Sequence, residues 1–142
     1  MAIKQLSVFV ENKQGKLSDV IKAIAKADIN IRALSIADTQ DFGILRMIVS
    51  DTDKALDILK DDMIASKTDV IAVKMNDKEG ALGDILAVLE EAAINVDYAY
   101  AFTGSKELAA YVVFRVDDTK AAEDILSGKG IEIASEEDIK NI

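Results

Sequence analysis

The sequence predicts an α+β fold made of two βαββαβ units in tandem, one in residues 1–68 and one in residues 69–142. The strongest observation is an internal repeat, because residues 11–21 and 76–86 share Lys, Gly, Leu and Asp at the same spacing. Later matches keep their order, and the offset grows from 65 to 69 only where loops are expected. The other two observations are an alternation of apolar and polar residues, as in strands, and apolar residues at helical spacing.

The first copy has the patterns of four strands and two helices. Residues 3–10 alternate and include β-branched and aromatic side chains, which favours a strand. Leu17, Val20 and Ile24 fall on one face of a helix over residues 16–27. The remaining elements are strands at 29–37 and 43–50, a helix from Asp51 or Thr52 to about Leu59, and a short strand at 63–66.

The second copy repeats this order after a link at residues 66–70. A helix is predicted where Leu82, Ile85 and Leu89 form an apolar stripe. The strands are expected at 70–75, 94–102, 108–116 and 131–134, with a second helix at 119–127. The order in both copies is the split-βαβ, ferredoxin-like plan, an antiparallel sheet with its helices on one face.

The composition excludes several kinds of chemistry. The chain has no His and no Cys, which excludes a Ser-His-Asp triad, a thiol nucleophile and a thiolate metal site. Its 17 basic and 26 acidic residues give a net charge of −9, which argues against a nucleic-acid partner. Because there is neither a signal-peptide pattern nor an apolar run of about 20 residues, we expect a cytoplasmic protein with no membrane segment.

Two short motifs resemble those of ACT domains. Residues 12–17 (Asn-Lys-Gln-Gly-Lys-Leu) and 77–82 (Asp-Lys-Glu-Gly-Ala-Leu) are similar to the family's N/D-x-x-G-x-L signature after the first strand. Residues 28–31 (Asp-Ile-Asn-Ile) and 93–96 (Ala-Ile-Asn-Val) look like its G-(I/V)-N-I step from helix to strand. The resemblance covers both copies, so the chain resembles a free-standing protein of two ACT domains.

The motifs depart from the family pattern at two places in each copy. Gln14 and Glu79 stand where ACT loops often have Pro before the Gly. Asp28 and Ala93 stand where the family usually has Gly before the I-N step. These differences affect the shape of the loop and of the helix exit.

The resemblance implies a non-catalytic regulatory protein that binds a small amino acid or a related carboxylate. The family's site lies where the loop after strand 1 and the start of helix 1 face a neighbouring ACT domain. Independently, a Gly lets the backbone approach a ligand, and a helix N-terminus suits a carboxylate. The candidate ligand-binding residues are Asn12, Lys13, Gln14, Gly15, Lys16, Leu17 and Asn30, and in the second copy Asp77, Lys78, Glu79, Gly80, Ala81, Leu82 and Asn95. No catalytic residue, metal or cofactor is expected.

Each candidate also has a purely structural interpretation. Gly15 and Gly80 are also what a tight turn requires, and the two Asn residues can simply ease the exit from a helix. Leu17 and Leu82 start the apolar stripes, so we favour the core for both. For the acidic residues 51, 53, 117 and 118 we favour helix capping over a metal site, and for residues 136–138 a solvated surface. Alternation places Tyr98, Tyr100 and Phe102 on one sheet face, where we favour packing over ligand stacking.

The two copies differ in charge and therefore in their predicted role. Residues 1–69 carry a net charge of −1, and residues 70–142 carry −8. We expect the first loop to bind a carboxylate better than the second.

The expected partners are a small amino-acid effector, a second copy of the chain in a homodimer, and a metabolic enzyme that is regulated. The alternative is a ligand-free module that serves only to dimerise or to dock on an enzyme. An acyl phosphatase is disfavoured because neither loop contains an Arg for a phosphate.

Overall fold

The computed structural model describes residues 2–38, 40–103 and 109–141. The chain divides into two compact units, which we call the N-terminal unit (Lys4–Thr68) and the C-terminal unit (Asp69–Ile142 with Met1–Ile3). The elements are β1 (Ile3–Glu11), α1 (Lys16–Lys26), β2 (Ile31–Asp38), β3 (Phe42–Val49), α2 (Thr52–Leu59), β4 (Ala65–Asn76), α3 (Ala81–Glu91), β5 (Val96–Thr103), β6 (Ala109–Val116), α4 (Thr119–Gly128), β7 (Ile133–Ala134) and α5 (Glu136–Lys140).

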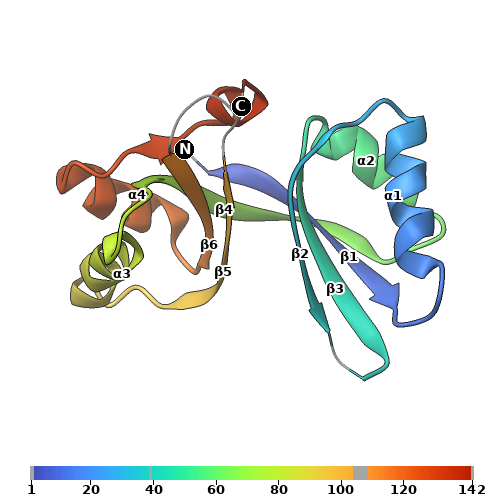
Figure 1. The fold of residues 1–142 in the computed structure, drawn as a ribbon, viewed down its shortest axis with the longest axis horizontal. Coiled ribbons are helices and arrows are strands. Elements are labelled where there is room, and N and C mark those ends of the chain that lie inside the picture. Colours follow the sequence, from blue (N-terminus) through green and yellow to red (C-terminus); the bar gives the residue numbers. More distant parts are fainter. Residues whose placement is uncertain (1, 39, 104–108, 142) are drawn as a thin grey trace. The chain divides into compact units, whose positions relative to one another are not determined.

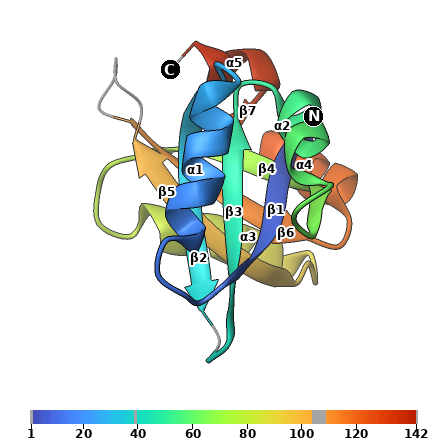
Figure 2. The same cartoon turned by 90° about the vertical axis from the view of Figure 1, so that its right-hand side faces the viewer.

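The N-terminal unit is a split βαβ arrangement. Strand β3 lies between β1 and β2 and is antiparallel to both. The amide of Phe9 donates to the carbonyl of Ile64 at 2.9 Å, so the chain that enters β4 runs along the other edge of β1. Both helices, α1 and α2, lie on the same face of these strands (Figures 1 and 2).

The core of this unit lies between that sheet face and the two helices. Alternate positions of β1 and β3 face the helices because side chains in a strand have a period of two. The apolar positions of α1 and α2 recur every three or four residues and meet them. The buried cluster consists of Leu6, Val8, Val20, Ile24, Ile29, Leu45, Met47, Val49, Ala55 and Leu59.

The C-terminal unit has the same topology. Strand β6 lies between β4 and β5, and the short β7 pairs with β4 on its other edge, all antiparallel. Helices α3 and α4 cover one face (Figure 1). The core consists of Ile71, Val73, Ile85, Leu89, Val112, Phe114, Val116, Ala122 and Leu126. The predicted α+β class, with two ferredoxin-like units in tandem, is therefore confirmed.

The predicted link at residues 66–70 is wrong, because β4 is one continuous strand of 12 residues. Its polar stretch at 66–69 resembles a loop in composition. That stretch contains no Gly or Pro to break the strand, and Thr68 is β-branched, which favours extended backbone. Within β4, residues up to Thr68 belong to the N-terminal unit and residues from Asp69 to the C-terminal unit.

Three predicted strands begin too early, and the reason is the same at each. The amides of Ile29, Ile94 and Ile131 donate back to the carbonyls of Ile24, Leu89 and Leu126, which closes the preceding helix. The strands at 29–37, 94–102 and 131–134 therefore begin at residues 31, 96 and 133. The predicted first residue of the strand at 108–116, Leu108, lies outside the described residues.

Helix α5 was not predicted. Ser135 Oγ accepts from the amide of Asp138 at 3.1 Å, and the Asp138 carboxylate accepts from the amide of Ser135 at 2.8 Å. This capping box starts the helix. The acidic residues 136–138 are exposed as expected, but they also form its first turn.

Candidate ligand-binding site

The loop between β1 and α1 is held against the β2–β3 hairpin. The amide of Asn12 donates to the carbonyl of Asp41 at 3.0 Å, and the amide of Lys13 donates to Glu11 at 2.8 Å. Gly15 then starts α1 with φ of 86°, and Gly80 starts α3 with φ of 83°. A Cβ at either position would meet nothing within 4 Å, so the backbone angle alone requires Gly there.

The N-cap residues of α1 and α3 are Gly15 and Gly80, which make no side-chain cap hydrogen bond. The other helices differ, because Asp51, Asp118 and Ser135 accept hydrogen bonds from the first turns of α2, α4 and α5. The first amides of a helix need a partner from outside it. At α1 and α3 the first amide already has one, because Lys16 donates to the carbonyl of Lys13 at 3.2 Å and Ala81 to that of Lys78 at 3.3 Å. For the amides that follow, the partner can be water or an anionic ligand group.

A cavity of about 120 Å³ lies beside this loop in the N-terminal unit, and we call it the N-terminal pocket. Its polar lining comes from Glu11, Asn12 and Lys13, and its apolar lining comes from Val10, Leu17, Ile36, Gly43 and Leu45. The structure thus brings three of the predicted residues together: Asn12, Lys13 and Leu17. Gln14, Gly15 and Lys16 are exposed neighbours in the chain that do not line it.

The core interpretation of Leu17 and Leu82 is wrong. Their exposed fractions are 40% and 41%. The buried residues of α1 start at Val20, and those of α3 are Ala81, Ile85 and Leu89. Leu17 and Leu82 thus lie at the edge of the core. Leu17 is therefore available to contact a ligand.

Glu11 is a residue of this site that sequence reasoning missed. Its carboxylate pairs with Lys13 Nζ at 3.1 Å. The hydrogen bond from Lys13, with the charges of Lys13 and Lys16, holds the pKa of Glu11 below its ordinary value. The sequence feature that could have identified Glu11 is its position at the end of the first strand, directly before the motif at residues 12–17. One cation and one anion at the pocket's mouth match the two charges of a zwitterion.

The second loop forms part of a different cavity. This cavity of about 440 Å³ is lined by the predicted residues Lys78 and Ala81, and on its other side by residues 130–132. Its walls also carry Lys74, Asn76, Asp84 and Glu132, and Lys74 lies 3.7 Å from Glu132. Asp77, Glu79, Gly80 and Leu82 do not line it. The two loops are therefore not equivalent in their surroundings.

The structure places Asn30 far from the first loop of its own unit. Asn30 precedes Ile31, which pairs with Val49, whereas Glu11 pairs with Phe42 at the opposite end of β3. The backbone amide of Asn30 donates to Ser50 Oγ at 2.9 Å. In the second copy, Asn95 Nδ2 donates to Asp97 Oδ1 at 3.1 Å. Their assigned ligand role stays a prediction.

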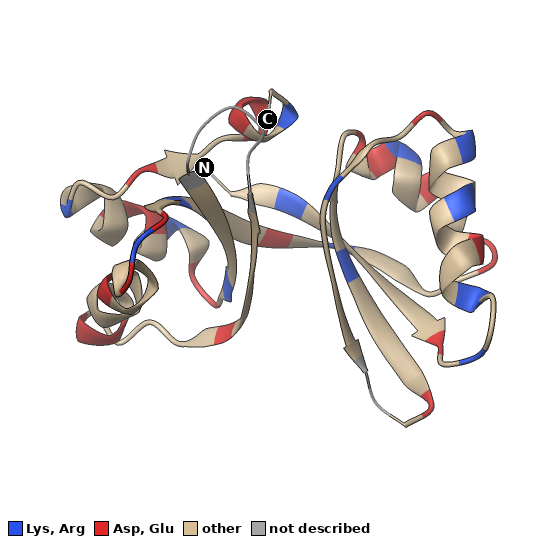
Figure 3. Cartoon of the chain, viewed as in Figure 1, with Lys and Arg blue, Asp and Glu red and all other residues tan. Residues whose placement is uncertain are grey.

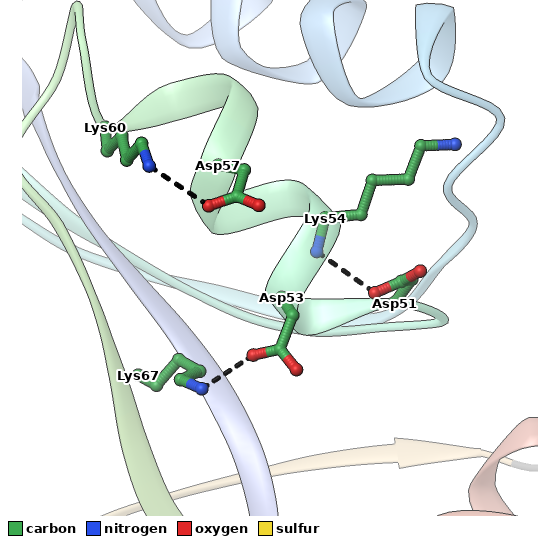
Figure 4. A network of polar contacts seen from close by, with 6 residues as sticks. All are labelled: Asp51, Asp53, Lys54, Asp57, Lys60 and Lys67. Carbon is green, nitrogen blue, oxygen red and sulfur yellow. Dashed lines mark hydrogen bonds and ion pairs between the residues drawn. The ribbon is translucent and has the colours of Figure 1, made fainter.

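The acidic residues before α2 and α4 cap those helices, as expected. Asp51 Oδ1 accepts from the amide of Lys54, and Asp118 Oδ1 from the amide of Ala121, both at 3.0 Å (Figure 4 shows the first). Asp53 pairs with Lys67 at 2.6 Å, which lowers the pKa of that carboxyl. Within the described residues, no group of three acidic side chains is placed to hold a metal ion.

The aromatic residues of β5 share one sheet face, as alternation predicts. Tyr98, Tyr100 and Phe102 stand opposite Arg115, Val113 and Tyr111 of β6. The rings of Phe102 and Tyr111 stack, with centroids 5.3 Å apart and planes at 17°. Phe114 points the other way, into the core.

None of the helices in the described parts of the chain is long and apolar enough to cross a membrane.

The model of the ACT domain pair matches the whole chain, residues 1–142. The chain belongs to this family. A crystal structure of protein BT0572 from Bacteroides thetaiotaomicron is 38% identical, with a TM-score of 0.92, and the alignment covers 100% of this chain and 98% of that one. No curated protein sequence matches the chain.

More distant solved structures share the fold. The ligand-free regulatory subunit of aspartate kinase from Thermus thermophilus is 13% identical, with a TM-score of 0.64 over 88% of this chain and 90% of that one. A structure of aspartokinase alpha and beta subunits is 18% identical, with a TM-score of 0.57 over 89% and 95%. At these identities the likeness concerns the fold of the domain pair.

Proposed function

We propose that this ACT domain pair is a non-catalytic regulatory protein that binds a small amino acid at the loop between β1 and α1. The observation that carries the proposal is the N-terminal pocket at the start of a helix with no side-chain cap. The amides of that helix end suit a carboxylate, and Glu11 suits an ammonium group. Asn12 offers both a donor and an acceptor. We assign one ACT domain to residues 1–68 and one to residues 69–142.

The first loop is proposed to be the stronger site. Lys13 and Lys16 lie in it, and Figure 3 shows basic segments along α1 where α3 has none. The second loop carries Asp77 and Glu79, and its unit holds most of the negative charge of the chain. A ligand carboxylate is attracted to the first electrostatic environment and repelled by the second.

A thermal-shift screen of the twenty amino acids tests the proposal. A ligand at one hundred times its Kd stabilises the folded state by about 2.7 kcal/mol, which corresponds to a rise in Tm of several degrees. We expect saturable stabilisation by one chemical class of amino acid. No shift with any of the twenty would favour the alternative, a ligand-free module that dimerises or docks on a metabolic enzyme.

We propose that the chain forms a homodimer and acts on a metabolic enzyme in the cytoplasm. The support for dimerisation is the outer edge of β2, where Leu34 is 51% and Ile36 is 44% exposed. An apolar edge strand of this kind favours pairing with another chain. Light scattering that gives the mass of a monomer at high concentration would contradict the dimer.

A further inference from the structure

The geometry points to a specific ligand class: the N-terminal pocket takes the side chain of a small aliphatic amino acid. This inference rests on the proposed function and names the class of effector for that same site. The cavity of about 120 Å³ lies well below the roughly 300 Å³ at which pockets for drug-sized ligands begin. It therefore has room for one small side chain.

The lining divides into a polar mouth and an apolar wall. Glu11, Asn12 and Lys13 belong to the loop, where both signs of charge are present. The other lining side chains are Val10, Leu17, Ile36 and Leu45, all aliphatic, and Gly43 has none. A side chain with its own polar group would lose water there without gaining a hydrogen bond from these residues. The pattern selects against polar and charged side chains.

Gly43 keeps the floor of the pocket open. It lies opposite Val10 in the pairing of β1 with β3. A Cβ at Gly43 would meet Ile36 Cγ2 at 3.3 Å, so a methyl group there would stand against the pocket wall. In the C-terminal unit the corresponding position opposite Met75 is Ala110, which already carries that methyl group. The two units thus differ at the floor of the pocket as well as at the mouth.

Part of the wall is exposed without a ligand. Leu17 is 40% and Ile36 is 44% exposed, and an aliphatic side chain between them would remove apolar surface from water. Each buried methylene contributes a factor of about four in affinity. Affinity should therefore rise from alanine through 2-aminobutyrate to valine. Phenylalanine, with its larger ring, is the comparison that tests the upper limit of the space.

The test is titration calorimetry of the full chain with this series, and with lysine and aspartate as polar comparisons. Gly43→Ala should flatten the rise from alanine to valine and weaken valine binding about tenfold. Leu17→Ala, a second variant at a half-exposed position, should flatten the rise as well. Gly83→Ala is the matched control, because Gly83 lies within α3 and a Cβ there meets nothing within 4 Å. It should leave the series unchanged.

The outcomes separate the two proposals. If no amino acid binds, the proposed function fails and the ligand class fails with it. If lysine, aspartate or phenylalanine binds more tightly than valine, or if Gly43→Ala binds valine as the unchanged chain does, an amino-acid site exists and the aliphatic class is wrong.

Discussion

Two opposite charges two residues apart define the chemistry at the mouth of the N-terminal pocket. Lys13 holds the Glu11 carboxylate 3.1 Å away and lowers its pKa. A ligand carboxylate can take the place of Glu11 beside Lys13, while the ligand ammonium takes the place of Lys13 beside Glu11. The chain has no His, the side chain whose charge ordinarily changes near neutral pH.

Ligand affinity is therefore expected to be constant between about pH 5 and 8. The pKa of Glu11 lies below its ordinary value of 4.5, so this carboxylate stays charged throughout that range. Its ion pair with Lys13 contributes fully above that value and is lost as the pH falls through the lowered pKa. Titration calorimetry at several pH values measures whether the affinity is constant, and Glu11→Gln, which has no carboxylate at this position, is the comparison variant. A decline in affinity between pH 7 and 6 would contradict the assignment of Glu11 and Lys13 as the charged groups that bind the ligand.

At the scale of elements, the ends of α1 and α3 show how the chain accommodates another residue where the family usually has Gly. Asp28 and Ala93 have φ of 58° and 56°, the left-handed conformation that Gly adopts more easily. The amide of Ile94 donates to Leu89, and that of Ala93 donates to Glu90, both at 2.9 Å, which is the Schellman pattern. The backbone of the motif is thus kept at the cost of local strain.

Replacing Ala93 by Gly is expected to raise the free energy of unfolding by up to about 1 kcal/mol. Relief of the left-handed strain outweighs the extra freedom of Gly in the unfolded chain. Gly130→Ala is the reverse comparison, because Gly130 ends α4 with φ of 77° and the same pattern of hydrogen bonds. It should lower the free energy of unfolding by about 1 kcal/mol. Urea unfolding measures both, and a loss of stability in Ala93→Gly would show that this exit is not strained.

At the scale of the whole molecule, the repeat made both units predictable, because apolar period and turn chemistry agree in each copy. The continuous β4 was not predictable from composition, since polar residues such as Lys67 and Asp69 occur in loops and in exposed strands alike. The loop site was predicted as a contiguous motif, and Asn12, Lys13 and Leu17 do line one pocket. Ile36 and Gly43 were missed because the pairing of β2 and β3 brings them there from outside the motif.

The charge difference between the halves has its clearest consequence at the two loops. The first loop combines an aliphatic lining with Glu11, Asn12 and Lys13, whereas Asp77 of the second loop lines neither described cavity. We therefore propose that the stronger effector site lies in the N-terminal unit, and this is the central claim.

The most direct test is titration calorimetry of Asn12→Ala and Asp77→Ala with the amino acid that stabilises the chain most. The two residues occupy the same motif position, so each variant is the control for the other. We expect Asn12→Ala to weaken binding at least tenfold, a loss typical of one hydrogen bond to a charged group, and Asp77→Ala to leave the affinity within about twofold. Equal losses in the two variants, or no loss in Asn12→Ala, would contradict the claim.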